Sequence, residues 1–239
     1  MKRASRGIGL IELMVALTLG LIVVLGVTQI FSSARLTYQS QNASAGIQED
    51  ARFLLSKMLQ EIRMVGMFGC LATVTDSSAS GTFSAVFDSP ITYAATAGGF
   101  TLTLVTADVG TSGGTPTWNI VSDCLTSATA FDAGNTPALT AGQIAFPVRR
   151  VVYTYQNNQL SVGSTTANQA GLVNNVDSLQ IMFGVATRAS DTLASSYVSV
   201  LPNPALVRSV RIVLALRDPN GRTRTQTFNV AASLRNRLL

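Results

Sequence analysis

An acidic side chain lies inside the most apolar segment of this sequence. Glu12 is the only ionisable residue between Ile8 and Ile30. The surrounding run, roughly 23 residues long, can cross about 30 Å of hydrocarbon as a helix. A carboxylate within a membrane span costs about 2.5–3.5 kcal/mol at mid-helix and less near its end. Glu12 therefore needs a partner, a position close to water, or a role in the chemistry of the chain.

Three cations, Lys2, Arg3 and Arg6, precede the apolar segment, and no comparable cluster follows it directly. This asymmetry predicts a cytoplasmic N-terminus and places everything beyond Phe31 across the membrane. A plain membrane anchor is one interpretation. A secretory signal cut after Ala34 is another, although the apolar run exceeds the usual 7–15 residues of a signal core.

A third interpretation comes from the sequence RGIGLIEL at residues 6–13. It resembles the prepilin peptidase site of type IV pilins and type II secretion pseudopilins, in which a short basic leader ends in Gly and the mature chain has Glu at its fifth position. The resemblance implies cleavage between Gly7 and Ile8, N-methylation of Ile8, and Glu12 as that fifth residue. Ile8 and Gly9 depart from the usual Phe followed by Thr or Ser.

The resemblance also gives Glu12 a partner. Cleavage would leave an ammonium group on Ile8 that is cationic near neutral pH. Two opposite charges in hydrocarbon attract strongly, and each is costly alone. The amine and the carboxylate could pair within one helix, whereas in the family's filaments the Glu neutralises the amine of a neighbouring subunit.

A narrower resemblance, to PilW-type minor pilins, rests on short stretches near both ends: QEDARF at 48–53, EIRMVGMFGC at 61–70, RTRTQTF at 222–228 and LRNRL at 234–238. It implies a subunit of a pilus priming or tip complex, acting in pilus assembly, adhesion and twitching motility. The implied partners are the prepilin peptidase, other minor pilins, the major pilin, the inner-membrane assembly platform and a tip adhesin. J-class type II secretion pseudopilins share much of this plan and remain an alternative, as does a secreted β-rich binding protein cut after Ala34.

The apolar span is predicted to continue as an amphipathic helix. No proline occurs between Arg35 and Met67, and apolar residues recur at steps of three and four, as on one buried helical face. These residues are Ile47, Ala51, Leu54, Leu55, Met58, Ile62 and Val65. Four charged residues are predicted on the other faces: Glu49, Arg52, Lys57 and Glu61, with Lys57 and Glu61 spaced for an ion pair. The domains are then a leader (1–7), a helix (8–69, with 8–31 transmembrane and 32–69 amphipathic) and a head (70–239).

The head is predicted to be β-rich. Strands are expected at 100–105 and 176–185, with one hairpin joining 151–155 to 160–162 through Asn157 and Asn158. A second antiparallel pair, 210–216 with 223–230, is expected around the turn residues 218–221. Segments 110–116 and 133–137, and the wider region 107–142, are predicted as loops. The fold class is α+β and pilin-like, with an antiparallel sheet packed on the C-terminal half of the long helix.

Cys70 and Cys124 are the only cysteines. Outside the cytoplasm such a pair is commonly oxidised, and we expect a disulfide, with two buried thiols as the alternative. A bridge of this span could add up to about 4 kcal/mol by the chain-entropy argument.

Composition argues against several functions. The chain has no histidine, so a Ser–His pair is impossible, and two cysteines are too few for a structural zinc site. We therefore expect no enzyme, cofactor or metal. The net charge of +5 includes the three cations ahead of the span. The C-terminal arginines alternate with apolar residues as on the solvent face of strands, and no nucleic-acid motif accompanies them.

Overall fold

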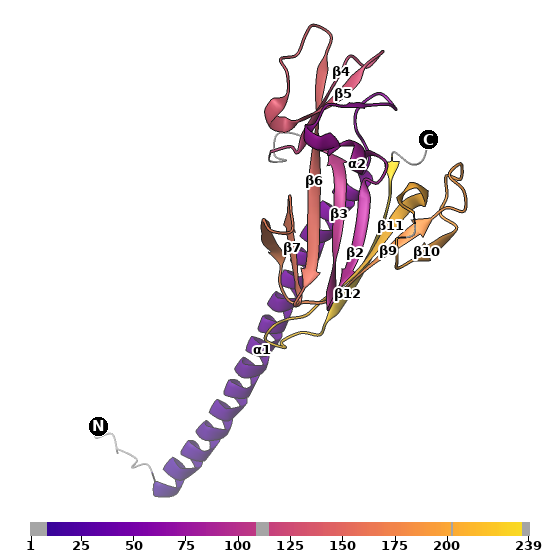
Figure 1. Ribbon diagram of the computed structural model, residues 1–239. Helices are drawn as coiled ribbons and strands as arrows, with labels where there is room; N and C mark the ends of the chain where they lie inside the picture. The colour runs from indigo at the N-terminus through magenta and orange to yellow at the C-terminus, as the bar shows by residue number, and fades with distance from the viewer. Residues whose placement is uncertain (1–8, 109–114, 202, 236–239) are drawn as a thin grey trace.

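The computed structural model describes residues 9–108, 115–201 and 203–235 of the 239-residue chain. One helix, α1 (Leu10–Arg63), is 54 residues long, or about 80 Å at 1.5 Å per residue. Its C-terminal half carries a β-rich head, and its N-terminal half projects away from the head as a bare rod (Figure 1). The fold is therefore the expected α+β, pilin-like architecture.

Two sheets make up the described part of the head. The first has the order β1-β5-β4-β6-β3-β2, with β7 paired to β6 and β8 paired to β7. Its strands are β1 (Thr75–Asp76), β2 (Ile91–Thr96), β3 (Gly99–Ala107), β4 (Trp118–Ser122), β5 (Ala128–Asp132), β6 (Ile144–Gln156), β7 (Gln159–Gly163) and β8 (Gln169–Val173).

The second sheet has the order β10-β9-β11-β12. Its strands are β9 (Val176–Val185), β10 (Ser196–Val198), β11 (Val207–Leu216) and β12 (Gln226–Ser233). Short helical segments occupy the connections: η1 (Ala79–Gly81), α2 (Ser84–Phe87), η2 (Ala133–Asn135) and η3 (Pro204–Leu206). Among the described strands, only β1 with β5 is a parallel pair.

The longest strand, β6, organises the first sheet. Its first residues pair with β4, its last residues pair with β7, and β3 runs along its other edge from Val148 to Tyr155. One strand thus joins the β4–β5 hairpin to the β7–β8 hairpin; in Figure 1, β4 and β5 lie at the top of the head, and β7 lies lower, beside α1.

The predicted stripe on α1 is confirmed. All seven predicted residues, from Ile47 to Val65, are buried and share one core with strands of both sheets, although Val65 lies just beyond Arg63, the last helical residue. A smaller core surrounds Trp118 and Phe83 at the distal end. The hydrophobic effect, at roughly 25 cal/mol per Å² of buried apolar surface, therefore holds helix and sheets together.

Both predicted hairpins are confirmed. Asn157 and Asn158 join β6 to β7 with positive φ angles of 53° and 58°, as a two-residue turn of this type requires. β11 pairs with β12 around residues 218–221, although β12 begins at Gln226 rather than at 223.

The prediction of loops throughout the region 107–142 is wrong. This region contains the strands β4 and β5. These strands are short and rich in small or polar residues, so their sequences lack a clear alternation. They are held by pairing with each other and with β6, and by the burial of Trp118. The expected loop at 133–137 includes the short helix η2, and much of the expected loop 110–116 lies outside the described residues.

The long helix ends before the predicted residue 69. Its last helical residue is Arg63, and the amide of Met64 already bonds to the carbonyls of Glu61 and Ile62. Gly66 then adopts a positive φ of 75°, which a side chain would disfavour, and the chain leaves the helix axis.

Leu54 and Phe53 offer a direct comparison of the two faces of α1. Leu54 is fully buried, whereas Phe53 is 54% exposed. We expect Leu54→Ala to lower the free energy of unfolding of the head by about 2–5 kcal/mol, because it leaves a cavity. Phe53→Ala should change it by less than about 1 kcal/mol. Urea unfolding of the full chain in detergent, followed by Trp118 fluorescence, measures both, and equal effects would contradict this assignment of faces.

Candidate processing and anchoring site

Glu12 lies in the first turn of α1 and is exposed. Gly9 precedes the helix in an extended conformation, and its carbonyl accepts hydrogen bonds from the amides of Glu12, at 3.0 Å, and Leu13, at 3.2 Å. A carboxylate in the first turn of a helix interacts favourably with the helix dipole. Gly7 and Ile8, the residues of the expected cleavage site, lie outside the described residues.

The rod that follows Glu12 presents apolar side chains on every face. α1 is long and apolar enough to cross a membrane, and its most apolar stretch makes no burying contact with the head. The hydroxyl groups of Thr18 and Thr28 donate to the carbonyls of Val15 and Leu25, each at 2.9 Å, so neither needs an external acceptor. Added side-chain atoms at Gly20 and Gly26 would meet no neighbour within the chain. Every apolar side chain of the rod therefore requires a surrounding other than its own head.

Comparison with protein families supplies the decisive observation. Residues 2–28 match the family model described as the prokaryotic N-terminal methylation motif. The chain carries a type IV pilin-like prepilin signal. A search of curated proteins found no match to the chain.

The matched segment runs from the basic residues ahead of the apolar segment through Glu12 to most of the apolar rod. Such a signal implies processing by a prepilin peptidase, assembly with other pilins, and anchoring in a membrane. It is also typical of a structural subunit rather than an enzyme. Within the described residues, no group of three or more His, Cys, Asp or Glu side chains could hold a metal ion.

A buried acid joins α1 to the head. Glu61 was predicted on a solvent face, but it is only 6% exposed. Its Oε1 pairs with Lys57 Nζ at 2.8 Å, and its Oε2 accepts a hydrogen bond from the hydroxyl of Tyr153. A buried carboxylate is tolerable only when such partners satisfy it. Sequence spacing indicated the Lys57 pair, but nothing in it indicated a tyrosine 92 residues away.

The hydrogen bond from Tyr153 connects Glu61 of α1 to the central strand of the first sheet. It lies on β6 and is fully buried. Burial raises the pKa of its phenol, and the negative charge of nearby Glu61 raises it further, so Tyr153 remains a neutral donor. The ion pair with Lys57 lies within α1, whereas the hydrogen bond from Tyr153 and the apolar stripe connect α1 to the sheets and fix the direction in which it leaves the head.

Cys70 and Cys124 form a disulfide in the structure. It ties the segment after α1 to the β4–β5 loop, which also encloses Asp123. The amides of Leu125, Thr126 and Ser127 donate to Asp123, as do two hydroxyl groups. These hydrogen bonds hold the pKa of Asp123 well below its usual range. The β4–β5 loop is thus fixed both covalently and by a satisfied carboxylate.

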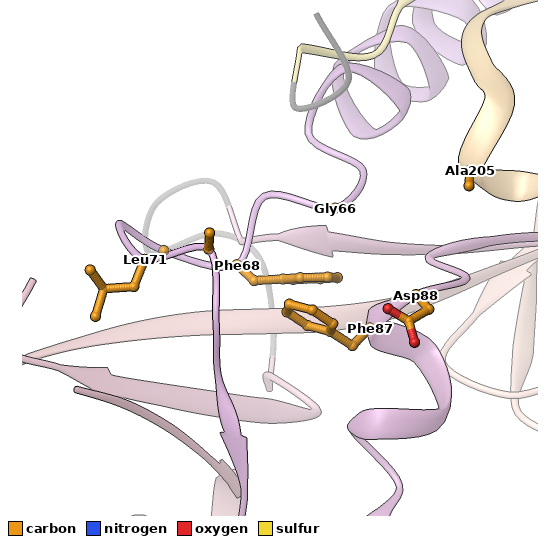
Figure 2. Close-up of a pocket in the computed structure, with 8 residues that line it drawn as sticks. Gly66, Phe68, Leu71, Phe87, Asp88 and Ala205 are labelled. Atoms are coloured by element: carbon orange, nitrogen blue, oxygen red, sulfur yellow. The ribbon is translucent and has the colours of Figure 1, made fainter. Parts of the chain in front are cut away.

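A pocket of about 520 Å³ opens where α1 gives way to the distal half of the head. Figure 2 shows the rings of Phe68 and Phe87 facing each other, with centroids 5.5 Å apart, and Leu71 directed away from them. Among the described residues that line the pocket, Asp88 is the only titratable one, and the others are apolar or glycine.

Removing the Tyr153 hydroxyl tests the hydrogen bond between Tyr153 and Glu61. Tyr153→Phe should lower the free energy of unfolding by about 1.5–3 kcal/mol at neutral pH, because Glu61 loses a donor in a buried site. The wild-type phenol has its pKa raised by folding, whereas the unfolded value is about 10. Its contribution is therefore fully present below about pH 10 and is lost as the pH rises further. Above about pH 10 the free energy of unfolding of the variant should fall less steeply with pH than that of the wild type. The two slopes should differ by up to about 1.4 kcal/mol per pH unit.

Urea unfolding in detergent at about pH 7 and about pH 11 measures both effects. Tyr38→Phe, at a tyrosine that is 70% exposed on α1, is the matched control and should behave as the wild type. An unchanged pH slope in Tyr153→Phe would contradict the assigned role of the phenol.

Proposed function

We propose that this prepilin is a minor pilin of the PilW type that helps to initiate type IV pilus assembly within a priming or tip complex. The observation that carries the proposal is the match of residues 2–28 to the methylation motif. It is supported by a bare apolar rod with a single acid in its first turn. Cleavage would fall between Gly7 and Ile8, and Ile8 would become the methylated N-terminus.

The PilW-like segments are the reason for proposing a pilus subunit, and two of them lie together in the fold. The stretch at 222–228 leads into β12, the strand that lies along α1 where the helix enters the head. There Gln226 Nε2 donates to Ser44 Oγ of α1 at 2.6 Å. The resembling stretch 48–53 begins one turn of the helix further on and includes Ala51, which is fully buried. These two segments thus belong to one packing unit.

In this proposal the chain first resides in the inner membrane, with a cytoplasmic N-terminus and a periplasmic head, and then enters a pilus on the cell surface. Its partners are other minor pilins, the major pilin, the inner-membrane assembly platform and a tip adhesin. The amine of Ile8 and the carboxylate of Glu12 neutralise each other, within one subunit or between neighbours, when the rod is surrounded by apolar side chains instead of lipid.

A count of surface pili by electron microscopy tests the proposal. Cells that lack this gene should lose pili, and complementation should restore them while protein secretion stays normal. Mass spectrometry of the mature chain should find Ile8 at its N-terminus. Normal pili with impaired secretion would instead assign the chain to the type II secretion pseudopilins. A mature chain beginning at Arg35 would indicate a secreted protein cut after Ala34.

Glu12→Ala separates processing from assembly. We expect the variant chain to begin at Ile8 as the wild type does, and its amount in sheared pili to fall on the order of tenfold, equivalent to about 1.4 kcal/mol of lost charge pairing. Glu49→Ala, at an exposed acid of α1 outside the span, is the control and should be incorporated normally. Unchanged incorporation of Glu12→Ala would refute the pairing role.

A further inference from the structure

The turn between β11 and β12 is the part of the head that reaches furthest toward the bare half of α1. In Figure 1 this turn meets the helix at the lower end of the head. Gly221 and Arg222 of the turn line a cleft together with helix residues between Leu36 and Gln41. The turn is anchored there by the hydrogen bond from Gln226 to Ser44.

Four arginines gather at this level. All four side chains are exposed, and we call the group the cationic rim: Arg35 on α1, and Arg217, Arg222 and Arg224 on the turn and its flanks. Their exposure distinguishes them from Arg208 of the same sheet, which is buried and donates to four backbone carbonyls.

Two acids lie beside the rim and offset part of its charge. Asp218 pairs with Arg222 at 3.3 Å, and hydrogen bonds from Arg222 lower the pKa of Asp218, so this acid stays ionised. The amide of Arg217 donates to the carbonyl of Asn175 at 3.1 Å, so Asp177, two residues further along the chain, lies close to Arg217. Four cations against two acids leave the rim with an excess of two positive charges.

The opposite end of the head has a different charge. Around β1, α2 and the β4–β5 hairpin the chain carries four aspartates: Asp76, Asp88, Asp123 and Asp132. Two arginines of β6 also lie toward that end, but Arg149 is paired with Asp108 at 3.2 Å, and Arg150 covers the Trp118 ring at 5.1 Å. Arg63 and Arg235 line one pocket at the C-terminal end of α1 and add two cations there. With Asp108 the far end holds five aspartates against these four arginines, so it has no positive excess, unlike the rim.

The rim lies at the height of a membrane surface. Leu36 is five residues beyond Phe31, the last residue of the apolar segment, which corresponds to about 8 Å along the helix. A headgroup layer extends roughly 5–7 Å beyond each side of the hydrocarbon. Arginine side chains can span the remaining distance, and charges interact over about 8–10 Å at physiological salt. Tyr38, 70% exposed at the same level, is a residue type enriched at membrane interfaces.

We infer that the cationic rim binds the phosphodiester headgroups of anionic lipids while the prepilin is anchored and not yet assembled. This inference rests on the membrane anchoring of the proposed function and goes beyond it by assigning the head a contact with the bilayer surface. The contact orients the head over the membrane, because the turn lies on one side of α1 only. It is lost when the subunit leaves the bilayer for a filament.

Photo-crosslinking to lipid tests the inference directly. Benzoylphenylalanine replaces Asn220, an exposed residue of the turn, in the full processed chain. The chain is reconstituted into vesicles of phosphatidylcholine alone or mixed with phosphatidylglycerol. We expect lipid adducts in the mixed vesicles. Replacing Arg217, Arg222 and Arg224 by Gln should reduce them at least about tenfold, because each arginine near an anionic surface favours contact roughly fivefold.

Two matched triple variants control this experiment. Substitution of the same three arginines by Lys keeps the charge and should keep the adducts. Substitution of Arg188, Arg211 and Arg235 by Gln removes the same net charge away from the rim and should also keep them. Retention of Trp118 fluorescence shows that each variant is folded.

The possible failures are distinguishable. Alkali extraction of the wild-type chain from the vesicles would contradict membrane anchoring itself. A chain that resists alkali but gives no adduct, or equal adducts in both kinds of vesicle and in the Gln variant, would overturn the lipid contact alone. Reduced pilus incorporation of the Gln variant without any lipid adduct would assign the rim to an acidic protein partner and would likewise overturn it.

Discussion

A single unbroken helix has to satisfy two different surroundings, and most of the structure follows from that constraint. The first half of α1 is apolar on all sides and finds no cover within the described chain. The second half is amphipathic, and its apolar stripe is buried in a core shared with both sheets. Between them the backbone remains helical from Leu10 to Arg63. The head is therefore joined to the apolar half by continuous helical backbone, with no loop between them.

Two different kinds of interaction attach α1 to the head. Apolar burial supplies most of the favourable free energy, but it is not directional. The bond from Tyr153 to Glu61 is directional, and it also fixes the rotation of α1 against β6. Removing one partner would leave a polar group buried and unpaired, which is why such contacts are demanding of geometry. Since β6 also carries the β4–β5 and β7–β8 hairpins, this contact relates the helix to both ends of the head.

Much of the fold could be predicted from the sequence because its strongest signals are local. The stripe on α1, the turn at Asn157 and Asn158, and the strand at 176–185 each depend on residues close together in the chain. The strands β4 and β5 could not be predicted in this way. Pairing with β6 and the burial of Trp118 determine them, and their own sequences show no clear alternation of apolar and polar residues. The burial of Glu61 escaped prediction for the same reason, since its partner is distant in sequence. Within the candidate site, the geometry around Glu12 is described, whereas Gly7 and Ile8 rest on the sequence motif alone.

The position of β12 has a consequence for biogenesis. Among the described elements β12 is the last strand, and it lies against α1, the first helix; Gln226 and Ser44 are separated by 182 residues. Contacts of such long range form slowly, and they are impossible until β12 has been synthesised. The apolar rod and the stripe on α1 emerge from the ribosome long before that moment. The stripe therefore stays without part of its cover, and open to aggregation, until β12 has been synthesised.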